Sequence, residues 1–151
     1  MRVAALALLG ALAFVAAGCG GGSRPTLAQF DKKTSSICAG YTKRARTELA
    51  PLQGNPLSPN AKPEELARLS RLLQHVATLF GQQLADLSQV RPPSGSAQRY
   101  AQVLRLYGQI EGAVSRAARA ARRGDKVGVA TAEQELSALG QEASALGFKC
   151  G

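Results

Sequence analysis

The chain has 151 residues, a net charge of +9, and a composition that is 45% hydrophobic but only 5% aromatic, with no tryptophan. Abundant alanine and leucine with few strand-favouring residues argue against a β-sheet protein, and the length suits one domain with one core. One histidine and three cysteines exclude an ordinary zinc site.

The first 25 residues have the pattern of an export signal followed by a tether. Arg2 precedes an apolar run over residues 3–17, which is shorter than the about 20 residues of a membrane span. The run leads into Ala-Gly-Cys-Gly around Cys19, which looks like the lipobox of a bacterial lipoprotein. We therefore expect a signal peptide over 1–18, a lipidated cysteine with a glycine-rich tether over 19–25, and a helical domain over 26–151. An uncleaved N-terminal anchor is the alternative, and it leaves the topology unchanged.

The domain is predicted to begin with an amphipathic helix. Thr26 and Gln29 form a capping-box pattern, and apolar side chains then recur every three or four residues, with Cys38 at the edge of their stripe. A Pro- and Gly-rich loop over residues 53–60 ends this helix. The stripe consists of Leu27, Phe30, Thr34, Ile37, Tyr41, Ala45, Leu49 and Leu52.

A second helix is predicted to start near Lys62, with Pro63 in its first turn, where the missing N–H costs nothing. It is the most heavily apolar element, and we expect it to lie deepest in the fold. The break over residues 91–96 ends it. Its stripe contains Leu66, Leu69, Leu73, Val76, Phe80, Leu84 and Leu87.

Two further helices complete the domain. The third begins at Ala97 and stops at Gly124, after which Asp125 can cap the fourth, and Gly147 closes it. Small residues after position 107, including a Gly-x-x-x-Gly spacing, predict a close approach of another helix. Four amphipathic helices with short connections predict an all-α, antiparallel up-down-up-down four-helix bundle. In that topology the C-terminal tail returns to the end at which the tether enters.

The three cysteines can be divided between two roles. If lipid modifies Cys19, then Cys38 and Cys150 remain, and an oxidising compartment favours a disulfide between them. The alternative is two separate thiols. The predicted bundle makes this disulfide feasible rather than obligatory. For Cys150 to reach Cys38, the C-terminal tail must fold back along the first helix, or the first helix must extend beyond the end of the bundle.

The segment around residues 30–39, the Pro-rich connections and the ending Ala-Leu-Gly-Phe-Lys-Cys at 145–150 resemble small, uncharacterised helical lipoproteins of Actinobacteria. The resemblance covers most of the mature chain. It strengthens the pairing of Cys38 with Cys150, and it implies no activity and no catalytic residues.

Positive charge gathers toward the C-terminal ends of the first and third helices. Because these helices run parallel in the bundle, we expect both groups at the end remote from the tether. Simple complementation of helix C-termini explains such a distribution, and mutual repulsion of neighbouring arginines makes an anionic partner such as wall polymer or lipid headgroups the alternative. The candidate binding residues are Lys43, Arg44, Arg46, Arg116, Arg119, Arg122, Arg123 and Lys126.

No catalytic pattern is evident. The ten acidic residues fall mostly off the apolar stripes, where solvation places them, and His75 lies on a flank of the second helix, where we expect it to be solvated. We therefore expect no enzyme activity, no cofactor and no metal.

Together these patterns predict a protein anchored by lipid to the cell membrane on its extracytoplasmic side. It would have a binding or envelope-structural role and no nucleic-acid partner. The alternative is an extracytoplasmic carrier that holds a small apolar ligand within the bundle.

Overall fold

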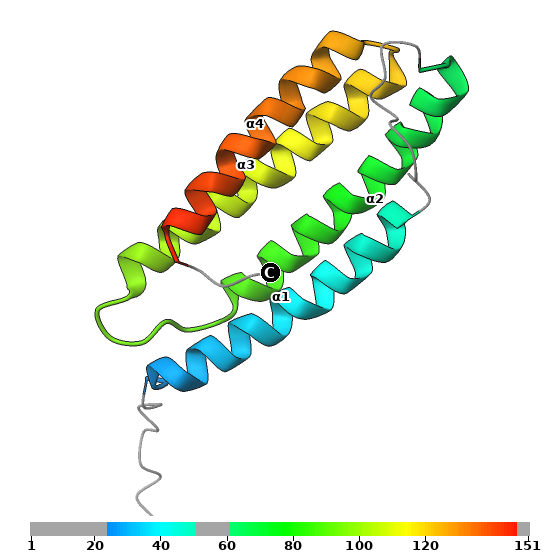
Figure 1. Ribbon diagram of the computed structural model, residues 1–151. Coiled ribbons are helices and arrows are strands. Elements are labelled where there is room, and N and C mark those ends of the chain that lie inside the picture. Colours follow the sequence, from blue (N-terminus) through cyan, green and yellow to red (C-terminus); the bar gives the residue numbers. More distant parts are fainter. Residues whose placement is uncertain (1–23, 51–60, 148–151) are drawn as a thin grey trace, which may run out of the picture.

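The computed structural model describes residues 24–50 and 61–147, which form four α-helices (Figure 1). Consecutive helices run antiparallel and pack against each other, α1 on α2, α2 on α3 and α3 on α4. The described ranges contain no strand, so the predicted all-α four-helix bundle is confirmed. The helices are α1 (Leu27–Leu49), α2 (Pro63–Ser88), α3 (Ala97–Arg122) and α4 (Lys126–Ala145).

Several predictions concern residues that the structure does not describe. The expected signal peptide, Cys19, most of the tether, the loop over 53–60 and Cys150 all lie outside the described residues. Of the range expected to form the tether, the structure describes only Arg24 and Pro25, directly before α1.

Local hydrogen bonds set the helix ends where the sequence predicts them. The Thr26 hydroxyl accepts from the backbone N–H of Gln29 at 3.2 Å, and the Gln29 side chain accepts from the N–H of Thr26 at 2.9 Å. Asp125 accepts from the N–H of Gly128 at 2.8 Å and so caps α4. Gly124, between α3 and α4, has a φ of 70°, a conformation that favours glycine.

The antiparallel topology gives the bundle two distinct ends (Figure 1). The proximal end carries the start of α1, the connection between α2 and α3, and the end of α4. The distal end carries the end of α1, the start of α2 and the turn between α3 and α4. Because Arg24 precedes α1, the expected tether would join the domain at the proximal end.

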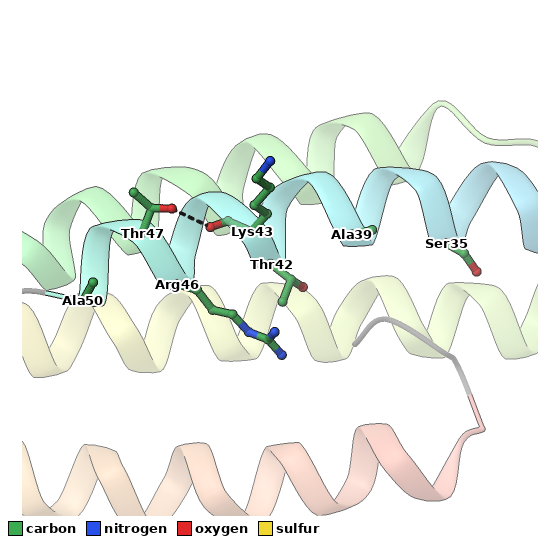
Figure 2. A pocket seen from close by; sticks show the side chains of 7 residues that line it. All are labelled: Ser35, Ala39, Thr42, Lys43, Arg46, Thr47 and Ala50. Atoms are coloured by element: carbon green, nitrogen blue, oxygen red, sulfur yellow. Dashed lines mark hydrogen bonds between the residues drawn. The ribbon is translucent and has the colours of Figure 1, made fainter.

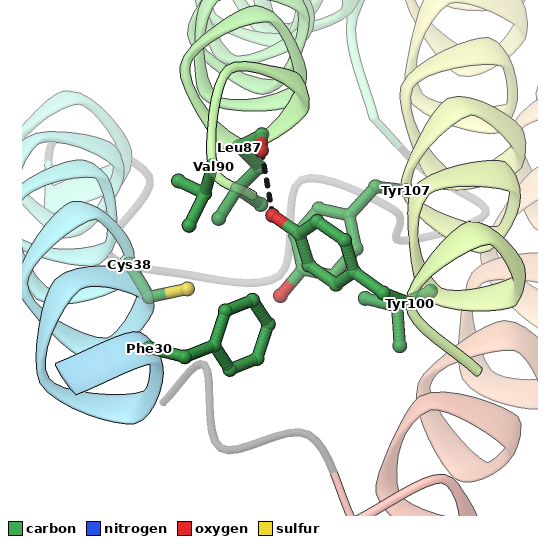
Figure 3. Close-up of a cluster of buried hydrophobic side chains, with 7 residues drawn as sticks. Phe30, Cys38, Leu87, Val90, Tyr100 and Tyr107 are labelled. Atoms are coloured by element: carbon green, nitrogen blue, oxygen red, sulfur yellow. Dashed lines mark hydrogen bonds between the residues drawn. The ribbon is translucent and has the colours of Figure 1, made fainter. Parts of the chain in front are cut away.

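The proximal core is built from large side chains (Figure 3). Phe30 meets Tyr100 edge-to-face, with ring centroids 5.0 Å apart, and the Tyr100 hydroxyl donates to the Leu87 carbonyl at 2.6 Å. Burial raises the pKa of Tyr100 to about 12. The members of this core are Phe30, Cys38, Leu87, Val90, Tyr100, Val103 and Tyr107.

Two details of the first stripe differ from prediction. Cys38 is only 1% exposed and lies inside the proximal core instead of at the edge of the stripe, because α1 turns that side toward the residues that end α2. Leu27 is 60% exposed, because it lies in the first turn of α1, outside the proximal core.

The distal core combines alanines with larger aliphatic side chains. Ser70 of α2 donates to the backbone carbonyl of Ala118 in α3 at 2.8 Å, which requires the two helices to approach closely. A Cβ added at Gly128 would lie 3.0 Å from the Cβ of Ala120, so α4 also approaches α3 closely. The members of this core are Ala61, Leu66, Leu69, Ala120, Ala121 and Val129.

The most buried helix is α3, not α2. Ten α3 side chains are buried against seven of α2, and the large α2 side chains Leu73, Phe80 and Leu84 are only half-buried. The expectation that the second helix lies deepest is therefore wrong. The physical reason is that small side chains let both α2 and α4 pack against α3.

The Gly-x-x-x-Gly spacing does not form the close contact. A Cβ added at Gly112 would meet only Arg116 of the same helix at 3.3 Å, and one at Gly108 would make an ordinary 3.7 Å contact with Leu84. The close approach relies on the neighbouring alanines, of which Ala117 and Ala118 are buried.

Candidate functional site

The C-terminal end of α3 presents a group of cations that we call the distal basic surface. Arg116 binds Glu135 of α4 at 2.5 Å, and Arg123 lies 3.7 Å from Asp125. The hydrogen bond with Arg116 lowers the pKa of the exposed Glu135 carboxyl and raises that of the guanidinium. The surface consists of Arg116, Arg119, Arg122, Arg123 and Lys126.

Two members of this surface are not neutralised. Arg119 and Arg122 are exposed and form no ion pair with a carboxylate of the described residues. Arg119 lines a hollow of about 390 Å³ between α3 and α4 and another of about 470 Å³ between α2 and α3. Arg119 thus borders a hollow on each side of α3.

The predicted cations of α1 behave differently. Arg44 lies over the ring of Tyr41, 4.1 Å from the centroid, which is a cation–π contact. The Tyr41 hydroxyl donates to Asp86 of α2 at 2.7 Å, and burial followed by this hydrogen bond raises the pKa of Tyr41. Arg44 therefore contacts its own helix, over the tyrosine that joins α1 to α2.

The other two α1 cations line a hollow of about 760 Å³ along this helix (Figure 2). Lys43 and Arg46 lie there among small polar side chains, and the Thr47 hydroxyl donates to the Lys43 carbonyl at 3.1 Å. None of the hollows described here contains cations from both α1 and α3. The two predicted groups share one end of the bundle but are not brought into one site.

The structure adds a basic group that the sequence reasoning did not select. We call it the proximal basic surface, and it consists of Arg24, Lys33, Arg91 and Arg99. These residues are far apart in the chain, and only the return of the α2–α3 connection to the start of α1 brings them to one end. The signal was available, because the predicted topology already placed residues 24–33 and 91–99 together.

The other residues singled out in the sequence are a histidine, possible metal ligands and a cysteine pair. The His75 side chain is 70% exposed, with Nδ1 3.8 Å from the Glu48 carboxylate, so it is solvated as expected. Within residues 24–50 and 61–147, no group of three or more histidine, cysteine or acidic side chains is arranged to hold a metal ion. No helix in these ranges is long and apolar enough to cross a membrane. The pairing of Cys38 with Cys150 stays a prediction.

Comparison with known proteins gives no family assignment. No protein-family model matches the chain, and no curated protein or solved structure shows significant similarity to it. The surfaces and cores of the bundle are therefore the basis for the function proposed below.

Proposed function

We propose that this protein is a lipid-anchored helical domain on the extracytoplasmic side of a bacterial membrane, where its distal basic surface binds an anionic wall polymer. Lipid on Cys19 holds the tether at the membrane, and a disulfide between Cys38 and Cys150 closes the domain. The observation that carries the proposal is the pair Arg119 and Arg122, exposed and unneutralised within the described residues at the end opposite the tether.

Distance supports a wall polymer over the bilayer as the partner of this surface. The 26 residues of α3 span about 39 Å at 1.5 Å per residue. Electrostatic attraction to lipid headgroups decays over about 8 Å at physiological salt. An upright bundle therefore carries its distal cations beyond the reach of the membrane surface, into the region that the polymers occupy.

The test is binding of the detergent-solubilised, full-length protein to purified cell-wall sacculi. We expect wild type to sediment with intact sacculi, to dissociate as salt rises, and to stay in solution when the anionic polymers have been stripped from the wall. Arg119→Glu with Arg122→Glu should abolish most of the bound fraction, because the substitutions replace two accessible cations by carboxylates.

A matched control is Lys32→Glu with Arg105→Glu, which makes the same charge change at exposed positions away from the distal end. This control should bind as wild type does. An equal loss of bound protein in both double variants would show that binding depends on net charge and not on the distal basic surface. Salt-independent binding to stripped sacculi would refute the polymer as partner.

One observation favours the second candidate, a carrier of a small apolar ligand. In the middle of the bundle, large apolar side chains from all four helices are only half-buried around Val76 and Val114. They are Leu49, Leu73, Phe80, Ile110 and Leu136. Native mass spectrometry of protein purified from its host discriminates the two functions, because a carrier retains a bound small molecule of constant mass.

A further inference from the structure

The proximal end combines cations with one exposed apolar side chain. Arg24 precedes α1, Lys33 lies in the second turn of α1, and Arg91 follows α2. All three side chains are exposed. Arg99, at the start of α3, donates a hydrogen bond to the carbonyl of Leu146 and so holds the end of α4 at this surface. Three separate segments thus contribute positive charge to the end at which the tether enters.

The cations Lys33 and Arg91 face a common hollow. Its volume is about 500 Å³, it lies between the start of α1 and the residues after α2, and the amide side chains Gln29 and Gln89 also line it. No carboxylate is among its described lining residues, and neither cation forms an ion pair within the described ranges. A smaller neighbouring hollow of about 110 Å³ does contain Asp31, opposite Arg99. The larger hollow therefore offers cationic donors without a competing carboxylate among its described lining residues, which suits a phosphate group.

An exposed leucine lies at the same end, on the smaller neighbouring hollow that Asp31 and Arg99 also line. Leu27 is 60% exposed in the first turn of α1, two residues after Pro25, which lines the hollow of Lys33 and Arg91. The other large apolar side chain that is exposed among the described residues is Val127, 77% exposed at the distal start of α4, where it lines a hollow with Arg119. An apolar side chain beside cations is the combination that an interfacial segment presents to a bilayer, and the proposed anchor joins the chain near Leu27, not near Val127.

We propose that the proximal end is a docking surface for anionic phospholipid, with Lys33 and Arg91 binding headgroup phosphates and Leu27 inserting among the acyl chains. This inference rests on the lipid anchor of the proposed function. A tether of about seven residues has a reach of about 15 Å, so the anchor keeps this end close to the headgroups. Docking then sets the bundle upright and directs the distal basic surface away from the membrane.

The absence of tryptophan from the chain allows a direct test. Leu27→Trp and Val127→Trp each introduce a single fluorophore at an exposed apolar position, one at each end. The full-length lipidated proteins are reconstituted into vesicles of phosphatidylglycerol with phosphatidylcholine, or of phosphatidylcholine alone, with brominated acyl chains as quenchers.

In the anionic vesicles, Leu27→Trp should shift its emission to shorter wavelength and be quenched by the brominated chains, and high salt should reverse both effects. Val127→Trp should keep the emission of an exposed tryptophan and escape quenching. Equal spectra of Leu27→Trp in the two lipid mixtures, or quenching of Val127→Trp, would overturn the docking surface.

Charge reversal provides the second arm. Lys33→Glu with Arg91→Glu, in the Leu27→Trp background, should abolish the shift, whereas the exposed pair Arg68→Glu with Arg71→Glu on α2 should leave it intact. A shift that survives the first pair would overturn the proposal. Helical circular dichroism confirms that each variant is folded, and salt reversal in the unmutated background gives the same answer should a variant unfold.

Flotation separates this inference from the one on which it rests. Protein that fails to float with either vesicle has no functional lipid anchor, which contradicts the proposed function. Protein that floats with both vesicles but shows no shift in either is anchored without docking, which contradicts only the inference drawn here.

Discussion

The cores at the two ends of the bundle differ in the side chains that fill them. The proximal core uses aromatic and large aliphatic groups, and a tyrosine hydroxyl satisfies a backbone carbonyl within it. The distal core uses alanines that let three helices approach each other closely. Large side chains fix the positions of neighbouring helices through their complementary shapes. Small side chains do so because the short distance between the helices leaves no room for a larger side chain. The proximal core should therefore be sensitive to the removal of atoms, and the distal core to their addition.

The surfaces differ as well. The proximal basic surface is a lysine and three arginines from three segments beside an exposed leucine. The distal basic surface consists mainly of arginines on one helix, two of which are held by carboxylates at 2.5 Å and 3.7 Å. Both surfaces also border an exposed apolar side chain, Leu27 at the proximal end and Val127 at the distal end. The proposed anchor, and not this feature, assigns the bilayer to the proximal surface.

The largest stability effect should come from the proposed proximal disulfide. Cys38→Ser should lower the melting temperature by several degrees, because a closed loop of roughly 110 residues contributes about 4–5 kcal/mol at most in the chain-entropy model. Cys150→Ser should have the same effect, and reductant should reproduce it in wild type. Identical melting of wild type with and without reductant would remove the disulfide from the account.

The next effect compares the two cores directly. Leu87→Ala deletes a side chain that is 0% exposed in the proximal core, and the cavity should cost about 2–5 kcal/mol. Ala121→Val adds atoms at a distal position that is 2% exposed, and overpacking should cost about 1–3 kcal/mol. Both values come from urea unfolding. A neutral or stabilising Ala121→Val would show that the distal helices do not approach each other as closely as described.

The smallest effect is a dependence of stability on alkaline pH. Burial raises the pKa of Tyr100 and Tyr107 to about 12 in the folded protein, from an ordinary value of 10.0. Folding therefore retains protons that the unfolded chain loses, so this contribution is complete below pH 10 and is lost as the pH rises toward 12. Tyr107→Phe should lose less stability than wild type between pH 10 and 12. Parallel pH curves would contradict the burial of this hydroxyl.

Sequence patterns predicted where the helices begin and end better than they predicted which helix residues are buried. Thr26, Asp125 and Gly124 act through hydrogen bonds and backbone conformation a few residues away, so the sequence alone locates the helix ends. The stripe positions of Leu27 and Cys38 were predicted, but their burial was not, because it depends on how far α1 extends along α2 and on which side of it faces the core. Periodicity identifies an apolar face and does not say which neighbour covers it.

The same limit applies to the candidate site. Parallel helices place the cations of α1 and α3 at one end, as predicted, but the rotation of each helix about its axis decides whether Arg46 and Arg119 meet, and they line separate hollows. The proximal basic surface was missed because its residues form no cluster along the chain. Lys33 and Arg91 come together only through the fold.

The proposed anchor at Cys19 would determine which end faces the membrane, and the mass of the mature N-terminal peptide tests it most directly. We expect protein purified from its host membrane to begin at Cys19 and to carry the added mass of a diacylglycerol thioether, with Cys19→Ala lacking that mass. A mature chain that retains residues 1–18, or that begins after Cys19, would contradict the lipid anchor and the polarity derived from it.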